Sequence, residues 1–244
     1  MKQRYKKMLI VSLSINALFL IASLVAFFQL GGVTTVKNYL GFPTADQQSD
    51  FDYIERTTLF KEEKKEQKIP DDATVFLGDS LTFRTEWSEL FPDETILNRG
   101  IEGDTTQGVY DRLDDVIDEK PAKIFLLIGI NDLLQGEDQK TVVKNYQRIL
   151  DKLKSSLPDT KVYVQSLFPI NSDQHTDFTN NQDVNDLNKQ IKAIAKDKGY
   201  DYIDIHSKLM KDNQLNENYT EDGLHLNGQG YSVWVHTIQD KVSE

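Results

Sequence analysis

The side chains best suited to chemistry in this sequence are a serine that follows a short apolar run and an acid and a histidine near the C-terminus. The serine is Ser80, in the string Gly-Asp-Ser-Leu at residues 78–81, and the pair is Asp222 and His225. A serine hydroxyl is a weak nucleophile at neutral pH unless an imidazole takes its proton and a carboxylate fixes the tautomer of that imidazole. These residues predict a nucleophile, a base and an orienting acid.

The spacing of the acid and the histidine indicates how they are presented. Asp222 precedes His225 by three residues, so both can lie on one tight loop, and Gly223 between them would allow that loop to turn. The signature Gly-x-Ser-x-Gly of α/β-hydrolases is not met, because Thr82 occupies the position of the second glycine. An ordinary α/β-hydrolase is therefore not expected.

Four short blocks in order resemble the SGNH (GDSL-type) hydrolase and esterase superfamily. They are residues 78–81 (Gly-Asp-Ser-Leu), 98–101 (Asn-Arg-Gly-Ile), 129–132 (Gly-Ile-Asn-Asp) and 222–225 (Asp-Gly-Leu-His). The resemblance implies catalysis by Ser80, His225 and Asp222. It also implies an oxyanion hole made by the backbone N–H groups of Ser80 and Gly100 and the side-chain amide of Asn131. Such donors stabilise the negative charge that forms on an ester carbonyl oxygen.

Each block has a structural interpretation as well. Ser80 could cap a helix after the first strand, Gly100 could be a turn glycine, Asn131 could stabilise a loop, and Asp222 could be a turn residue. Four blocks in order favour the catalytic interpretation. Asp104, followed by Gln107 three residues later, is typical of a helix-capping arrangement.

The overall charge and the histidine positions exclude several classes of ligand. The formal net charge is -11, which argues against nucleic acid as a partner, because phosphate binding needs clustered lysine and arginine. The sequence contains four histidines and no ligand-spaced pair among them, so His175, His206 and His236 are expected to be surface or structural residues and no metal site is expected. The expected reaction needs no cofactor.

The N-terminus predicts a single membrane span. Residues 1–7 form a basic tail, and residues 8–30 contain no charged residue. That length is enough to cross a bilayer core of about 30 Å, and positive charge ahead of the span predicts a cytoplasmic N-terminus with the rest of the chain outside the cell. A cleaved signal peptide is the alternative, but the apolar region is longer than is usual and no clear cleavage site follows.

The remainder of the chain predicts a spacer and one α/β domain. Residues 31–70 form the spacer and an amphipathic helical segment, with Phe51, Ile54, Leu59 and Phe60 as packing residues, and residues 71–244 form the hydrolase domain. Apolar strand-like runs there alternate with helical patterns. The predicted strands are residues 74–77, 95–98, 123–128, 161–167 and 202–205. This pattern predicts a three-layer, flavodoxin-like α/β/α domain with a central parallel five-stranded sheet, whose ligand site lies beyond the carboxyl ends of the strands.

These features predict a membrane-anchored, extracytoplasmic serine esterase. Its expected substrates are small acyl esters, acetyl esters among them, on surface glycans or small molecules. A second interpretation is a lipid acyl hydrolase, similar to platelet-activating-factor acetylhydrolases or lysophospholipases. A third is a non-catalytic carbohydrate-binding module that has kept the fold. The sequence makes no prediction of the oligomeric state.

Overall fold

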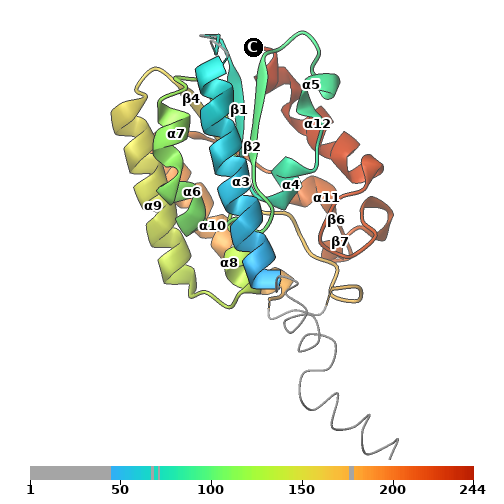
Figure 1. The fold of residues 1–244 in the computed structure, drawn as a ribbon. Coiled ribbons are helices and arrows are strands. Elements are labelled where there is room, and N and C mark those ends of the chain that lie inside the picture. The colour runs from blue at the N-terminus through green and yellow to red at the C-terminus, as the bar shows by residue number, and fades with distance from the viewer. Residues whose placement is uncertain (1–44, 67–68, 71, 176–178) are drawn as a thin grey trace, which may run out of the picture. The chain divides into compact units, whose positions relative to one another are not determined.

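Five short parallel strands form the central sheet of the domain (Figure 1). The structure is a computed structural model that describes residues 45–66, 69–70, 72–175 and 179–244. The strands are β1 (Thr74–Gly78), β2 (Ile96–Gly100), β3 (Lys123–Leu127), β4 (Lys161–Gln165) and β5 (Asp201–Ile203). Their order is β2-β1-β3-β4-β5, and every neighbouring pair is parallel. This is the flavodoxin-like order, so the predicted sheet is confirmed.

Helices cover both faces of this sheet. In Figure 1, α6, α7 and α9 lie on one side of the strands, and α4, α5 and α12 lie on the other. The helices are α3 (Ala45–Glu66), α4 (Ser80–Phe83), α5 (Trp87–Leu90), α6 (Thr106–Asp111), α7 (Leu113–Ile117), α8 (Ile130–Leu134), α9 (Gln139–Ser156), α10 (Asn181–Lys198), α11 (His206–Leu209) and α12 (Gly228–Val242). A hairpin of β6 (Met210–Lys211) and β7 (Gln214–Leu215) and a 3-10 turn, Glu217–Tyr219, precede α12. The three-layer α/β/α architecture is therefore confirmed.

Aromatic side chains join neighbouring strands to the helices on one face. Phe76 on β1 stacks on Phe125 of β3 at 4.9 Å, and Phe125 stacks on Tyr163 of β4 at 4.7 Å. These three residues are paired in register across the sheet. Trp87 of α5 stacks on Phe76 at 3.9 Å and meets Trp234 of α12 edge-on at 4.8 Å. This packing fixes α12, the helix that follows His225, against the strand that precedes Ser80.

The part of α3 from Asp52 onward belongs to the same compact unit as the sheet. The helix contacts the domain through Tyr53, Arg56, Phe60 and Glu63, which recur at helical spacing. Phe60 is buried as predicted, whereas Ile54 and Leu59 are exposed. The packing face is aromatic and ionic, so an apolar pattern alone did not locate it.

The predicted membrane span, residues 8–30, lies outside the described residues and stays a prediction. Within the part of the chain that the structure describes, no helix has the length and apolar character needed to cross a bilayer.

Candidate active site

Ser80 is the first residue of α4, directly beyond the carboxyl end of β1. The carboxyl group of Asp79 caps this helix, because its Oδ1 accepts a hydrogen bond from the Leu81 N–H at 3.0 Å. Gly78 permits the tight turn, because a Cβ there would lie 2.2 Å from the Leu127 carbonyl oxygen. From α12, the Tyr231 hydroxyl donates to the Leu81 carbonyl at 2.8 Å. The turn that carries Ser80 is therefore stabilised by hydrogen bonds from Leu81 to Asp79 within the turn and from Tyr231 of α12.

The structure brings the predicted nucleophile, base and acid together. Ser80 Oγ lies 3.1 Å from His225 Nε2, and His225 Nδ1 lies 2.7 Å from Asp222 Oδ2. Ser80 is 145 residues away from His225 in the sequence, so this contact is a product of the fold. Ser80 is buried, the His225 side chain is 20% exposed and the Asp222 side chain is 52% exposed. The three groups form a continuous chain of contacts from the interior to the surface.

The loop that carries the acid and the base is built around the Asp222 carboxylate. Its Oδ1 accepts hydrogen bonds from the backbone N–H groups of Leu224 at 3.0 Å and His225 at 2.7 Å. Gly223 has a φ of 81°, and a Cβ there would lie 2.7 Å from the Asn171 carbonyl oxygen. Asn171 in turn donates its N–H to the Gly223 carbonyl at 2.8 Å. The loop therefore turns as the sequence predicts and is supported by the segment after β4.

The charge of Asp222 determines which nitrogen of His225 carries a proton. Burial raises the pKa of the Asp222 carboxyl, but hydrogen bonds from His225 and from the Leu224 N–H outweigh burial and lower this pKa to about 2. Ionised Asp222 can only accept, so His225 Nδ1 carries the proton in this contact. His225 Nε2 is then an acceptor for the Ser80 hydroxyl, which is the arrangement that a serine nucleophile needs.

Asn131 lies where its amide could donate to a developing oxyanion. It is the second residue of α8, directly beyond β3, and its Nδ2 donates to the Asp104 carbonyl at 2.9 Å. A primary amide has two N–H donors, so one remains for a ligand. The backbone N–H of Ser80 starts α4, where the first N–H groups of a helix have no partner within the helix. Both groups can therefore still donate.

Gly100 does not fit the predicted oxyanion role. Its backbone N–H donates to Asn98 Oδ1 at 2.9 Å, and Gly100 is the last residue of β2. A Cβ at this position would lie 2.3 Å from the Phe83 nitrogen. A glycine is required here because α4 passes close to β2, and the N–H is already used within the protein.

Gly103 is a candidate oxyanion donor that the sequence blocks did not predict. It lies in the loop after β2, has a φ of 70°, and directly precedes Asp104, whose carbonyl accepts from Asn131. No hydrogen bond between described residues uses its N–H. The sequence held a signal for it, because Gly-Asp-Thr at residues 103–105 follows the second strand much as Gly-Asp-Ser at residues 78–80 follows the first.

The capping role expected for Asp104 is wrong. The cap of α6 is Thr105, whose side chain accepts from the Gly108 N–H, and Gln107 contacts Asp111 instead. Asp104 is buried and pairs with Arg112 at 2.7 Å. A buried carboxylate is stable as an anion only with such a partner, and that requirement was not visible from local spacing.

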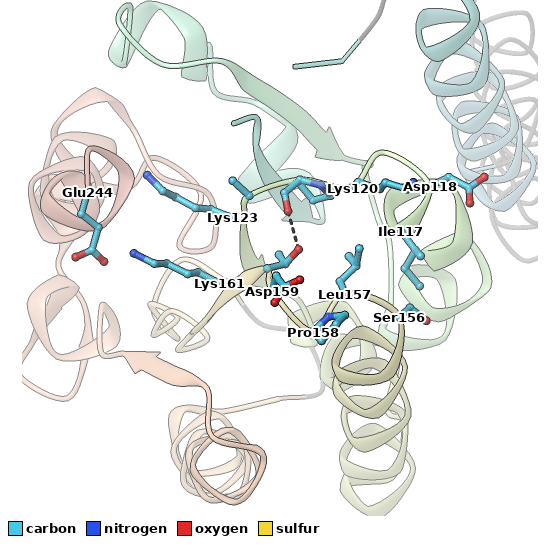
Figure 2. A pocket seen from close by; sticks show the side chains of 13 residues that line it. Ile117, Asp118, Lys120, Lys123, Ser156, Leu157, Pro158, Asp159, Lys161 and Glu244 are labelled. Carbon is cyan, nitrogen blue, oxygen red and sulfur yellow. Dashed lines mark hydrogen bonds between the residues drawn. The ribbon is translucent and has the colours of Figure 1, made fainter. Parts of the chain in front are cut away.

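A cavity of about 630 Å³ lies at the opposite end of the sheet (Figure 2). Lys123 and Lys161, which line it, are the first residues of β3 and β4, whereas Ser80 follows the last residue of β1. In Figure 2 these two lysines extend toward Glu244. This cavity is therefore separate from the triad. No group of three or more acidic, histidine or cysteine residues within the described ranges could hold a metal ion.

The fold and the triad geometry define a serine hydrolase of the α/β/α type, and comparison with known proteins gives the family. The model of the GDSL-like lipase/acylhydrolase family matches residues 76–233, more than half of the chain. The chain belongs to this family. The superfamily resemblance is confirmed.

Two curated relatives are similar over most of this chain. N-acylneuraminate cytidylyltransferase from Streptococcus agalactiae serotype V is 27% identical over 180 residues, which cover 72% of this chain and 41% of the relative. This chain thus spans less than half the length of that protein. Platelet-activating factor acetylhydrolase IB subunit alpha1 from Homo sapiens is 28% identical over 197 residues, which cover 78% of this chain and 82% of the relative.

Two solved structures share the fold. A GDSL-like lipase from Bacteroides thetaiotaomicron has a TM-score of 0.66 and 23% identity, with 77% of this chain and 97% of that chain covered. An acetyl xylan esterase has a TM-score of 0.60 and 24% identity, with 70% and 99% covered. At these identities the likeness establishes the fold alone.

Proposed function

We propose that this enzyme hydrolyses small acyl esters, with Ser80 as the nucleophile. The observation that carries the proposal is the chain of contacts from Ser80 Oγ to His225 Nε2 at 3.1 Å and from His225 Nδ1 to Asp222 at 2.7 Å. Ser80 Oγ attacks the acyl carbonyl while His225 Nε2 takes the hydroxyl proton, which it then gives to the leaving alcohol. Water, deprotonated by His225, next attacks the acyl-enzyme and releases the carboxylic acid and free Ser80.

Three donors would stabilise the oxyanion in both steps. They are the backbone N–H of Ser80, the free N–H of the Asn131 amide, and the backbone N–H of Gly103 in place of that of Gly100. The Asn131 contact with the Asp104 carbonyl supports this set, because it places the amide beside the loop that contains Gly103. Each such donor contributes about 2.7 to 4 kcal/mol to lowering the barrier in comparable hydrolases.

The proposed substrate class is supported by the groups that the names of relatives and fold neighbours contain. Acetyl groups are named in both the acetyl xylan esterase and the platelet-activating factor acetylhydrolase subunit. Sugars are named in two of the comparisons, xylan in one and N-acylneuraminate in the other. We therefore favour an acetyl ester on a glycan. A lipid acetyl ester is the second candidate, and its support is the 28% identity to the acetylhydrolase subunit.

The proposed location rests on the N-terminal sequence. The uncharged residues 8–30 behind a basic tail would anchor the chain in the cell membrane, with the catalytic domain outside the cell. An anchored enzyme on that side meets surface glycans. Carbonate extraction of membranes, and protease digestion of intact cells, test this arrangement: the full-length chain should stay in the membrane pellet, and the domain should be digested from outside.

A substrate comparison tests the proposed function. The purified full chain and its Ser80→Ala variant would be assayed with nitrophenyl acetate and nitrophenyl octanoate, with acetylated xylo-oligosaccharides and O-acetylated neuraminic acid, and with platelet-activating factor. We expect acetate to be released at least tenfold faster than octanoate, glycan esters to be cleaved faster than the lipid, and Ser80→Ala to be inactive on all of them.

Two results would change the conclusion. Faster cleavage of platelet-activating factor than of either glycan ester would favour the lipid candidate. Activity that persists in Ser80→Ala would exclude the proposed nucleophile altogether.

A further inference from the structure

A buried arginine connects the two loops that the proposed mechanism uses. Arg112 Nη2 lies 2.7 Å from Asp104 Oδ2, Arg112 Nε donates to the same oxygen at 2.9 Å, and Nη2 also donates to the Gly78 carbonyl at 3.1 Å. The side chains of Arg112 and Asp104 are 3% and 2% exposed. The Arg112 guanidinium therefore bonds both the end of β1, at Gly78, and the loop after β2, at Asp104.

Each end of this connection is close in sequence to a group proposed to act on the substrate. Gly78 is two residues before Ser80 and ends β1. Asp104 directly follows Gly103, and its carbonyl accepts the Asn131 amide at 2.9 Å. The Arg112 guanidinium therefore joins the nucleophile turn to the oxyanion loop through side-chain hydrogen bonds, in addition to the backbone hydrogen bond from the Ile101 N–H to the Gly78 carbonyl at 3.1 Å.

The surroundings of Asp104 leave it one arrangement. Its Oδ1 accepts from the Thr105 N–H at 2.9 Å, and a Cβ on Gly108 would lie 2.0 Å from that oxygen. Burial raises the pKa of the Asp104 carboxyl, and the charge and hydrogen bonds of Arg112 oppose this. Replacing a buried ion pair with apolar residues often leaves the stability of a protein unchanged or increases it, so stability alone does not account for this one.

We propose that Arg112 is a positioning residue for ester hydrolysis, which sets the oxyanion loop against the nucleophile turn by bridging Asp104 and Gly78. The inference rests on the proposed function. A lysine at this position would keep the positive charge but lacks the planar fork that reaches two acceptors. Displacing a catalytic group by about 1 Å can reduce the rate about 10²-fold.

The test compares Arg112→Lys and Arg112→Gln in the full chain with a matched control. Arg99 is the control, because its side chain is likewise buried, with 4% exposed, and is paired with a buried acid, Glu119, at 2.8 Å. Its ion pairs join β2 to Glu63 of α3 and to Glu119, which lies two residues after the end of α7, rather than to the two catalytic loops. The values of kcat and KM would be measured with nitrophenyl acetate, and kcat would be divided by the folded fraction from circular dichroism, so a destabilised variant remains informative.

For Arg112→Lys we expect kcat to fall about 10²-fold and KM to change less than about threefold. Arg99→Lys should lose stability and keep kcat within about threefold. Asp104→Asn, which changes the other end of the bridge, should lower kcat without a matching rise in KM. The inference is overturned if Arg112→Lys keeps wild-type kcat per folded molecule, or if Arg99→Lys loses as much kcat.

Ser80→Ala separates failure of this inference from failure of the proposed function. If Ser80→Ala is inactive while the Arg112 variants are fully active, only the positioning role is excluded. If Ser80→Ala remains active, the proposed function is excluded first.

Discussion

The Asp222 carboxylate builds the turn that leads to His225 and also orients its imidazole. Oδ1 accepts two backbone N–H groups of the loop, and Oδ2 contacts His225 Nδ1 at 2.7 Å. Because these tasks use different oxygens, they can be separated by substitution.

Asp222→Asn should keep the fold and remove most of the activity. The asparagine Oδ1 can still accept the Leu224 and His225 N–H groups, but its NH2 would donate to His225 Nδ1 and favour the wrong tautomer. We expect kcat to fall about 10⁴-fold, as in other hydrolases with this triad, with an unchanged circular dichroism spectrum. A loss of less than tenfold would mean that Asp222 does not orient the base.

Asn131→Ala should reduce kcat about 10²- to 10³-fold and leave KM nearly unchanged, because an oxyanion donor acts in the transition state. Asn188 provides the matched control. It is also buried, and its amide bonds both backbone groups of Leu167, at 2.8 Å and 3.0 Å. Asn188→Ala should lower the melting temperature without lowering kcat. Equal losses of kcat in both variants would refute a specific role for Asn131.

Gly100→Ala and Gly103→Ala should fail in different ways. A Cβ on Gly100 would meet the Phe83 backbone at 2.3 Å, so this variant should be strongly destabilised. Gly103→Ala places alanine at a φ of 70°, which costs about 1 to 2 kcal/mol and would shift the N–H proposed as a donor. We expect a folded protein with at least tenfold lower kcat. Wild-type kcat in folded Gly103→Ala would argue against that donor.

The stability of the protein should fall as pH rises toward 8 because of Asp79. Burial raises the pKa of its carboxyl to about 8, against the backbone hydrogen bond from Leu81, which lowers it. Between the unfolded pKa of 3.8 and the folded value, the folded state holds the proton more tightly, so this contribution is complete below pH 3.8 and is lost by about pH 8.

Asp79→Asn tests that assignment, because asparagine resembles the protonated acid and does not titrate. In urea unfolding at pH 8.5, we expect the variant to be more stable than the wild type by about 2 kcal/mol. At pH 4 the two proteins should unfold at similar urea concentrations. A variant that is less stable at both pH values would show that Asp79 is charged in the folded protein.

Local patterns sufficed to predict the sheet and the triad. Fully buried strands such as β1 and β3 appear in the sequence as continuous apolar runs, and the acid and base are near neighbours on one loop. The end of β1 places Ser80 at the carboxyl edge of the sheet, and the loop before α12 brings His225 to it.

The parts that the sequence did not predict depend on which partner each polar group takes in the folded chain. The Gly100 N–H donates a hydrogen bond to Asn98 Oδ1. Asp104 does not cap a helix but pairs with Arg112, eight residues further along the chain. The packing face of α3 was predicted only at Phe60, because the other residues that contact the domain there, Tyr53, Arg56 and Glu63, are polar or charged. In each case the hydrogen-bond or ion-pair partner of a polar group is set by the folded structure and could not be predicted from residue spacing.

Labelling with a fluorophosphonate probe tests the central claim most directly, because the probe phosphonylates only an activated serine. The full chain, Ser80→Ala and His225→Ala would be treated and the modified residue located by peptide mass spectrometry. We predict one label, on Ser80, that is absent from Ser80→Ala and strongly slowed in His225→Ala. A label on another serine, or equal labelling of Ser80 without His225, would contradict the account.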